Sequence, residues 1–204
     1  MQSFPFLLSI YALALPQFDR EAEGDRATLD EIIHILSLIQ SNSFTRNTTN
    51  PWMQLRELEP WVELEDFSGG SEEAQWDLAL ARALGNLQPW IDSSEDAPAT
   101  QEVNSGAVKA FIESISAYHL KQNLRPMSFP AVVQPEFFDL LQHRNPMALV
   151  ILAHYAVVLW YCREQWWCSN WGWRVVSVVA SMLTKRYVGA LAYPFQVLNL
   201  EEPA

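Results

Sequence analysis

The histidine and cysteine side chains of the C-terminal half are the residues whose types could support covalent or metal chemistry. His154 lies eight residues before Cys162, and Cys168 follows six residues later. A thiol beside an imidazole can act as a nucleophile, and the same groups bind zinc. No motif orders these residues as a nucleophile and its base, and the spacing of the two cysteines is wider than in structural zinc sites. We therefore expect no catalytic residue, no metal and no cofactor.

A cluster of tryptophans after His154 suggests a different chemistry, the binding of a flat apolar molecule. Five indoles lie within fourteen residues, at Trp160, Trp166, Trp167, Trp171 and Trp173. Such side chains can pack a core where two helices meet, or they can wall a pocket. The pocket hypothesis assigns ligand binding to His154, Tyr155, Trp160, Trp166 and Trp171. In the alternative the indoles are core residues, and a buried His154 bonds to the backbone.

The element that must position these side chains is the apolar run from Met147 to Cys162. It is sixteen residues long, whereas a membrane-spanning helix needs about 20 residues. No cluster of lysines and arginines flanks it, and His154 at its centre would be costly in lipid. We therefore predict a helix buried in the domain core. A short loop leads to a second helix from Trp173 to about Leu183, so the two should pack as a hairpin.

The remaining sequence predicts an all-α fold in a single domain, residues 1–204. Thr28 with Glu31 three residues later has the pattern of a capping box, which would start a helix at Thr28. The proline-containing segments 89–100 and 123–135 are predicted to interrupt regular structure. Apolar residues at helical spacing indicate further helices at 4–15, 28–41, 72–87, 105–122 and 136–144.

The negative charge of the chain, −11 in total, is concentrated in its N-terminal half. Residues 1–104 carry 18 acids and 5 bases, whereas residues 105–204 carry 6 acids and 8 bases. The segment 57–104 is acidic and expected to be partly loop, with Arg82 as the one base among twelve acids from Glu57 to Glu102. Such a surface repels a phosphate backbone, so we expect no direct binding of nucleic acid. Two cysteines in 204 residues favour a reduced compartment, the nucleus or the cytoplasm.

Several short motifs of the C-terminal half together resemble one family. They are Phe129-Pro130, Leu140-Leu141, Pro146, Ala148 to Leu159, Trp166-Trp167, Gly172 and Tyr193-Pro194. In this order they resemble the C-terminal part of the fungal-specific transcription-factor regulatory domain of the zinc binuclear cluster family, especially its sterol-uptake regulators. The match is specific from Met127 to Pro194. It is looser upstream, where Leu38-Ile39-Gln40-Ser41 replaces a leucine-leucine-arginine-glycine motif. Within the specific part, Trp160 replaces a histidine that is usual near the end of the long helix.

The resemblance implies an α-helical regulatory module that, in sterol-sensing members, holds an apolar ligand. Because this chain has no cysteine-rich segment, we expect a transcription-regulator-like protein without its own DNA-binding module. It would act through an apolar ligand, sterol-like or another metabolite, or through a protein partner, and would control a metabolic or biosynthetic gene set. The alternative is a small enzyme, a cyclase or isomerase of an apolar metabolite, that reuses the cavity. The fold does not decide between these two functions.

Overall fold

The computed structural model describes residues 25–44, 71–116 and 125–200, and within these ranges the chain is all-α, with no strand. The expected first helix at 4–15 lies outside the described residues. The elements are α2 (Asp25–Phe44), α4 (Ser71–Gly85), α5 (Gln88–Asp92), α6 (Pro98–Ser116), α7 (Arg125–Val132), α8 (Pro135–Gln142), α9 (Pro146–Tyr161), α10 (Trp171–Met182), the 3-10 helix η4 (Lys185–Leu191) and α11 (Ala192–Leu198).

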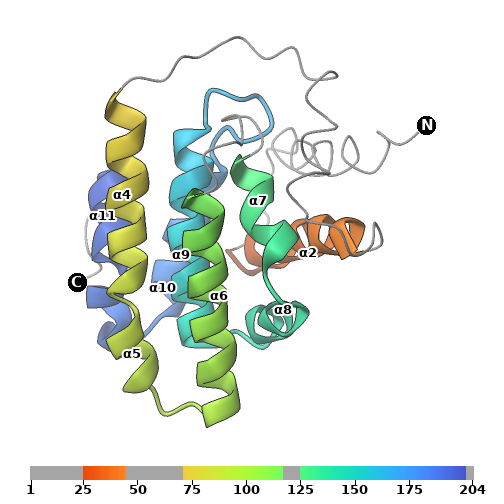
Figure 1. The fold of residues 1–204 in the computed structure, drawn as a ribbon, viewed down its shortest axis with the longest axis vertical. Helices are drawn as coiled ribbons and strands as arrows, with labels where there is room; N and C mark the ends of the chain where they lie inside the picture. The colour runs from red at the N-terminus through yellow and green to blue at the C-terminus, as the bar shows by residue number, and fades with distance from the viewer. Residues whose placement is uncertain (1–24, 45–70, 117–124, 201–204) are drawn as a thin grey trace.

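Helix α9 forms the centre of the fold, as its apolar sequence predicts. Every side chain from Met147 to Leu159 is buried. The helix contacts α4, α6, α7, α8, α10, η4 and α11. In Figure 1, α4, α6 and α9 stand side by side, and α2 lies crosswise to them next to α7 and α8. Among the described residues, no helix is both long enough and apolar enough to cross a membrane.

Helices α9 and α10 pack on each other as the short connecting loop predicts, and Gly172 allows their close approach. A Cβ atom on Gly172 would lie 2.7 Å from both the carbonyl oxygen of Ala156 and the backbone nitrogen of Trp160. No real side chain fits at these distances, so α10 can lie this close to α9 only with glycine at this position. The close packing of this hairpin therefore depends on the absence of a side chain at position 172.

Two segments that are predicted as loops are partly helical, and the positions of their prolines explain why. Residues 89–100 contain α5 and the first turn of α6, and α7 lies within 123–135, so the loop predictions are wrong there. Pro89 is in the first turn of α5, Pro98 begins α6 and Pro126 is the second residue of α7. A proline in the first helical turn loses no hydrogen bond because that N–H has no partner within the helix. These prolines start helices rather than end them.

Helix α2 begins before Thr28, so the predicted capping box is also wrong. The helix starts at Asp25, which places Thr28 inside its first turn. Thr28 is buried, and its hydroxyl oxygen accepts a hydrogen bond from the guanidinium of Arg174 at 3.0 Å. The side chain therefore joins α2 to α10 instead of capping a helix.

Candidate functional site

His154 provides the most buried polar group of a pocket beside α9. The side chain is 1% exposed and lines the pocket. Its Nδ1 atom lies 2.9 Å from the carbonyl oxygen of Val150, one turn earlier in the helix. Because burial removes the charged form from water, the pKa of His154 falls to about 4. The imidazole is therefore neutral at pH 7.

The hydrogen bond to Val150 also fixes which nitrogen of His154 carries the proton. A carbonyl oxygen can only accept a hydrogen bond, so Nδ1 must be protonated. In a neutral imidazole the other nitrogen, Nε2, then holds an unshared electron pair. His154 consequently offers a hydrogen-bond acceptor on the side of the ring away from Nδ1.

One wall of the pocket is the exposed side of α4 and the turn that follows it. Ala79, Arg82, Ala83 and Asn86 line this wall. They are spaced three or four residues apart, so they lie on one side of the helix. Arg82 and Asn86 are exposed, which places them at the solvent-facing mouth of the pocket.

The opposite wall comes from the C-terminal segment, more than one hundred residues later in the chain. Gly189 and Ala190 of η4 line it, together with Ala192, Tyr193 and Gln196 of α11. The space between the two walls, beside His154 of α9, has a volume of about 450 Å³ and is open to solvent. Four of the lining residues are alanines and one is glycine, and such small side chains leave space between the two walls unfilled.

Two aromatic rings line this pocket together with His154. The ring of Tyr193 lies nearly parallel to the imidazole, with an interplanar angle of 14° and ring centroids 6.2 Å apart. The hydroxyl groups of Tyr193 and Tyr161 are hydrogen-bonded to each other. Burial is the main reason that the pKa of Tyr193 is raised, and its phenol stays protonated at neutral pH.

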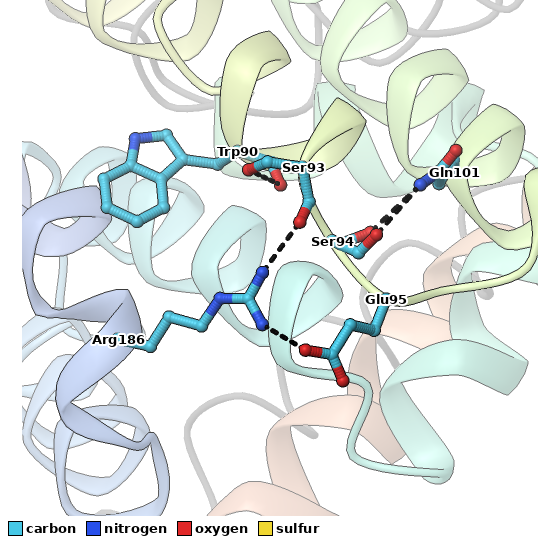
Figure 2. Close-up of polar contacts among 6 residues, drawn as sticks. All are labelled: Trp90, Ser93, Ser94, Glu95, Gln101 and Arg186. Carbon is cyan, nitrogen blue, oxygen red and sulfur yellow. Dashed lines mark hydrogen bonds and ion pairs between the residues drawn. The ribbon is translucent and has the colours of Figure 1, made fainter.

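Trp90 supplies the second aromatic ring, at the end of the pocket formed by α5. A Cβ atom on Gly189 would lie 3.2 Å from Cζ2 of Trp90, so the indole lies against the backbone of η4. Figure 2 shows how the polar groups around Trp90 hold these segments together. Arg186 bonds to Glu95 at 2.9 Å and donates to the carbonyl oxygen of Ser93 at 2.7 Å. These bonds tie η4 to the segment that carries Trp90.

Arg82 is the one charged side chain among the residues that line this pocket. The ion pairs between described residues join Arg144 to Asp30, Arg163 to Glu164 and Arg186 to Glu95. Arg82 takes part in none of them. It lies in the last turn of α4, where a positive charge also favours the helix dipole. A negatively charged group of a ligand could therefore bind this guanidinium without displacing a carboxylate of the described segments.

The five residues of the ligand-binding hypothesis lie in different surroundings, and only His154 lines this pocket. Tyr155 is buried against Phe111 and Phe129, with ring centroids 6.2 and 5.7 Å apart. Trp171 is fully buried, whereas Trp166 is 59% exposed. Trp160 is half-buried under the guanidinium of Arg163, which lies 4.7 Å from the ring centroid. The tryptophan-rich turn is therefore not part of the wall described above.

Cys162 and Cys168 are both buried free thiols in the turn between α9 and α10. Their side chains are hydrogen-bonded to each other, and burial strongly raises the pKa of Cys168. A thiol that stays protonated is a poor nucleophile. In the described segments, no group of three or more histidine, cysteine or acidic side chains is placed to hold a metal ion.

Comparison of the chain with known protein families, curated proteins and solved structures finds no match. The resemblance to the fungal regulatory domain therefore stays a prediction. The function has to be inferred from the chemistry of the pocket, its walls and the buried imidazole.

Proposed function

We propose that this chain is a regulatory module that binds a small, largely apolar molecule in the pocket between α4 and α11. The observation that carries the proposal is His154, which combines 1% exposure with a place in the pocket wall. A buried acceptor among alanine, leucine and aromatic side chains is typical of ligand sites, where a few polar groups orient an apolar body.

Regulation by such a ligand would act through the two walls. Helix α4 and the segment from η4 to α11 are far apart in the sequence, and both contact α9. A molecule that touches both walls would favour the conformation in which they lie at this distance. As in the family that the sequence resembles, the proposed output is control of a metabolic or biosynthetic gene set in the nucleus or cytoplasm, through the ligand or a protein partner.

The chemistry of the lining residues favours binding over catalysis. The pocket lining contains no cysteine, serine, threonine or carboxylate. With a pKa of about 4, His154 is a weak base, and a raised pKa makes Tyr193 a weak acid. The second candidate function, an isomerase of an apolar metabolite, is supported by one observation, the parallel rings of His154 and Tyr193. Together they could accept and donate a proton.

Purification from the organism that makes the protein tests ligand binding directly. We expect native mass spectrometry to detect a retained small molecule with the parent chain. The variant Ala83→Leu places a larger side chain in the pocket wall and should lose that molecule. The matched control Ala99→Leu changes an exposed residue of α6 outside the pocket and should keep it. Equal retention by both variants would contradict the proposed pocket.

The same preparation distinguishes a regulator from an enzyme. The parent chain is incubated with a metabolite extract, and the extract is compared before and after by mass spectrometry. A binding protein enriches one compound in the protein fraction and leaves its structure unchanged. Steady conversion of a compound, abolished in Ala83→Leu and retained in Ala99→Leu, would favour the isomerase.

A further inference from the structure

We infer that the ligand of the α4–α11 pocket is a flat acid, with a carboxylate at one end and a hydroxyl or N–H donor at the other. The inference rests on the proposed function, since it names the chemical class that the same pocket would bind. It depends on three features of the pocket. His154 provides a buried hydrogen-bond acceptor at the floor, Tyr193 and Trp90 provide aromatic rings at the sides, and Arg82 provides the single positive charge at the mouth.

The floor of the pocket selects for a hydrogen-bond donor. Nδ1 of His154 is already bonded to Val150, so the group left for a ligand is the unshared pair on Nε2. A hydroxyl or N–H group can donate to this nitrogen, whereas a second acceptor, such as a ketone or an ether, would be repelled by it. A ligand group that reaches His154 should therefore carry a proton to donate.

The sides of the pocket select for a flat body. Tyr193 lies parallel to His154, and Trp90 rests against Gly189 on the same side. Ala79 and Ala83 form the facing wall. Planar aromatic rings fit between such surfaces better than a branched chain, because ring faces and methyl groups then make contact over their full area.

The mouth of the pocket selects for a negative charge. Arg82 is the only charged lining residue and the one base in a stretch with twelve acids. Asn86 lies one turn further along the same wall and can donate from its side-chain amide. A carboxylate matches the planar fork of a guanidinium and forms two parallel hydrogen bonds with it.

A cationic ligand fits these residues less well. The lining offers no carboxylate to a positive group, and Arg82 would repel it. A neutral ligand, such as a sterol, would satisfy the floor and the sides but would make no use of Arg82. The net charge of −11 also disfavours anions in general, so binding of an acid would have to come from the local contact with this guanidinium.

A set of three naphthalene probes separates the contributions of the two ends. The compound 6-hydroxy-2-naphthoate carries both groups, 2-naphthoate lacks the donor, and 2-naphthol lacks the acid. Isothermal titration calorimetry at pH 7 would measure the Kd of each probe. The proteins are the parent chain and the variants Arg82→Gln and His154→Phe. The control is Arg163→Gln, which removes the same charge at an exposed residue beside Trp160.

We expect 6-hydroxy-2-naphthoate to bind most tightly to the parent chain. Arg82→Gln should weaken both naphthoates about tenfold, because a charge-assisted hydrogen bond is lost, and should leave 2-naphthol unchanged. His154→Phe should weaken the two hydroxyl probes about fivefold and leave 2-naphthoate unchanged. Arg163→Gln should bind all three probes as the parent does. Arg82 is exposed, so its variant tests the inference even if His154→Phe folds poorly.

Two different failures are distinguishable. If 2-naphthol binds as tightly as the acids and Arg82→Gln changes nothing, the ligand is not an acid, while the pocket of the proposed function stands. If none of the three probes binds the parent chain, both the acid class and this pocket as a binding site are overturned.

Discussion

The side chains of Asn145 and Asp96 are joined by a hydrogen bond of 2.9 Å at the start of the central helix. The amide of Asn145 donates to Asp96, and its oxygen accepts from the backbone nitrogen of Ala148 at 3.1 Å. The same oxygen accepts a bond of 3.3 Å from the amide of Asn104. The side chain of Asn145 thus caps α9 and links this helix to α6 and to the segment that precedes α6.

Replacement of Asn145 by alanine should lower the free energy of unfolding by about 2 kcal/mol or more. The helix loses its cap, and the buried amide of Asn104 loses its acceptor. Urea unfolding followed by circular dichroism measures the change. Asn170→Ala is the matched control, since Asn170 occupies the same position before α10 but makes no side-chain cap bond. A loss of similar size in both variants would contradict the role given to Asn145.

Replacement of Gly172 by alanine should separate α9 from α10. The new Cβ would overlap backbone atoms of Ala156 and Trp160, and we expect a cost of about 2 kcal/mol from this overpacking. Thermal unfolding provides the measurement. Gly85→Ala is the control, because a Cβ there meets no atom within 4 Å. The control should keep or slightly raise the melting temperature, since alanine favours a helix more than glycine does.

The stability of the folded chain should depend on pH through His154. Its pKa is about 4 in the folded chain and about 6.5 when unfolded. As the pH falls below 6.5, the unfolded state takes up a proton that the folded state does not, so stability decreases. The loss from this group is about 1.4 kcal/mol at pH 5.5 and reaches about 3 kcal/mol below pH 4.

The variant His154→Phe should lack this contribution. Urea unfolding at pH 7.5, 6.5 and 5.5 would compare its stability with that of the parent chain. The difference between the two proteins should change by about 1.4 kcal/mol in favour of the variant as the pH falls to 5.5. His143→Gln, at an exposed position after α8, should follow the parent. An unchanged pH profile in His154→Phe would show that the imidazole is not buried in solution.

The two thiols should react slowly with Ellman's reagent in the native chain. Cys162 and Cys168 are buried, and the raised pKa of Cys168 leaves almost no thiolate at pH 8. Both should react rapidly in concentrated urea, with release of about two equivalents of the coloured product. Rapid reaction of both thiols without urea would indicate that the turn between α9 and α10 opens readily. A Cys168→Ser variant identifies which thiol reacts first.

The central part of the fold could be predicted from the sequence because its signal is local. The length and composition of the run from Met147 to Cys162 predict one buried helix, and the structure has it at Pro146–Tyr161. The all-α class is confirmed across the described segments. The prediction of a loop at 89–100 holds for residues 93–97 and is wrong on either side of them, because Pro89 and Pro98 can be read as helix breakers or as helix starts. Only the surrounding packing decides between these two readings.

Most of the candidate site could not be predicted, because its members are far apart in the chain. Trp90 and Tyr193, about one hundred residues apart in the sequence, both line a space that is bordered by alanines and a glycine, and small residues form no recognisable motif. His154 stands out in the sequence as a polar residue in an apolar helix, and the structure has it in the pocket lining. In the sequence, Arg82 is notable only as a lone base among acids. No sequence pattern connects it to His154, which lies 72 positions later.

Helix α4 packs on the core with one side and lines the pocket with the neighbouring side. Leu80 and Leu84 are fully buried and hold the helix to the core, while Ala79 and Ala83 line the pocket on the neighbouring side. An exchange of Ala79 or Ala83 for a larger residue would reshape the pocket without removing any core contact. Selection can therefore alter the size of the accepted molecule in small steps while the fold keeps its stability. A lineage of related chains could diversify its ligands in this way without passing through unfolded intermediates.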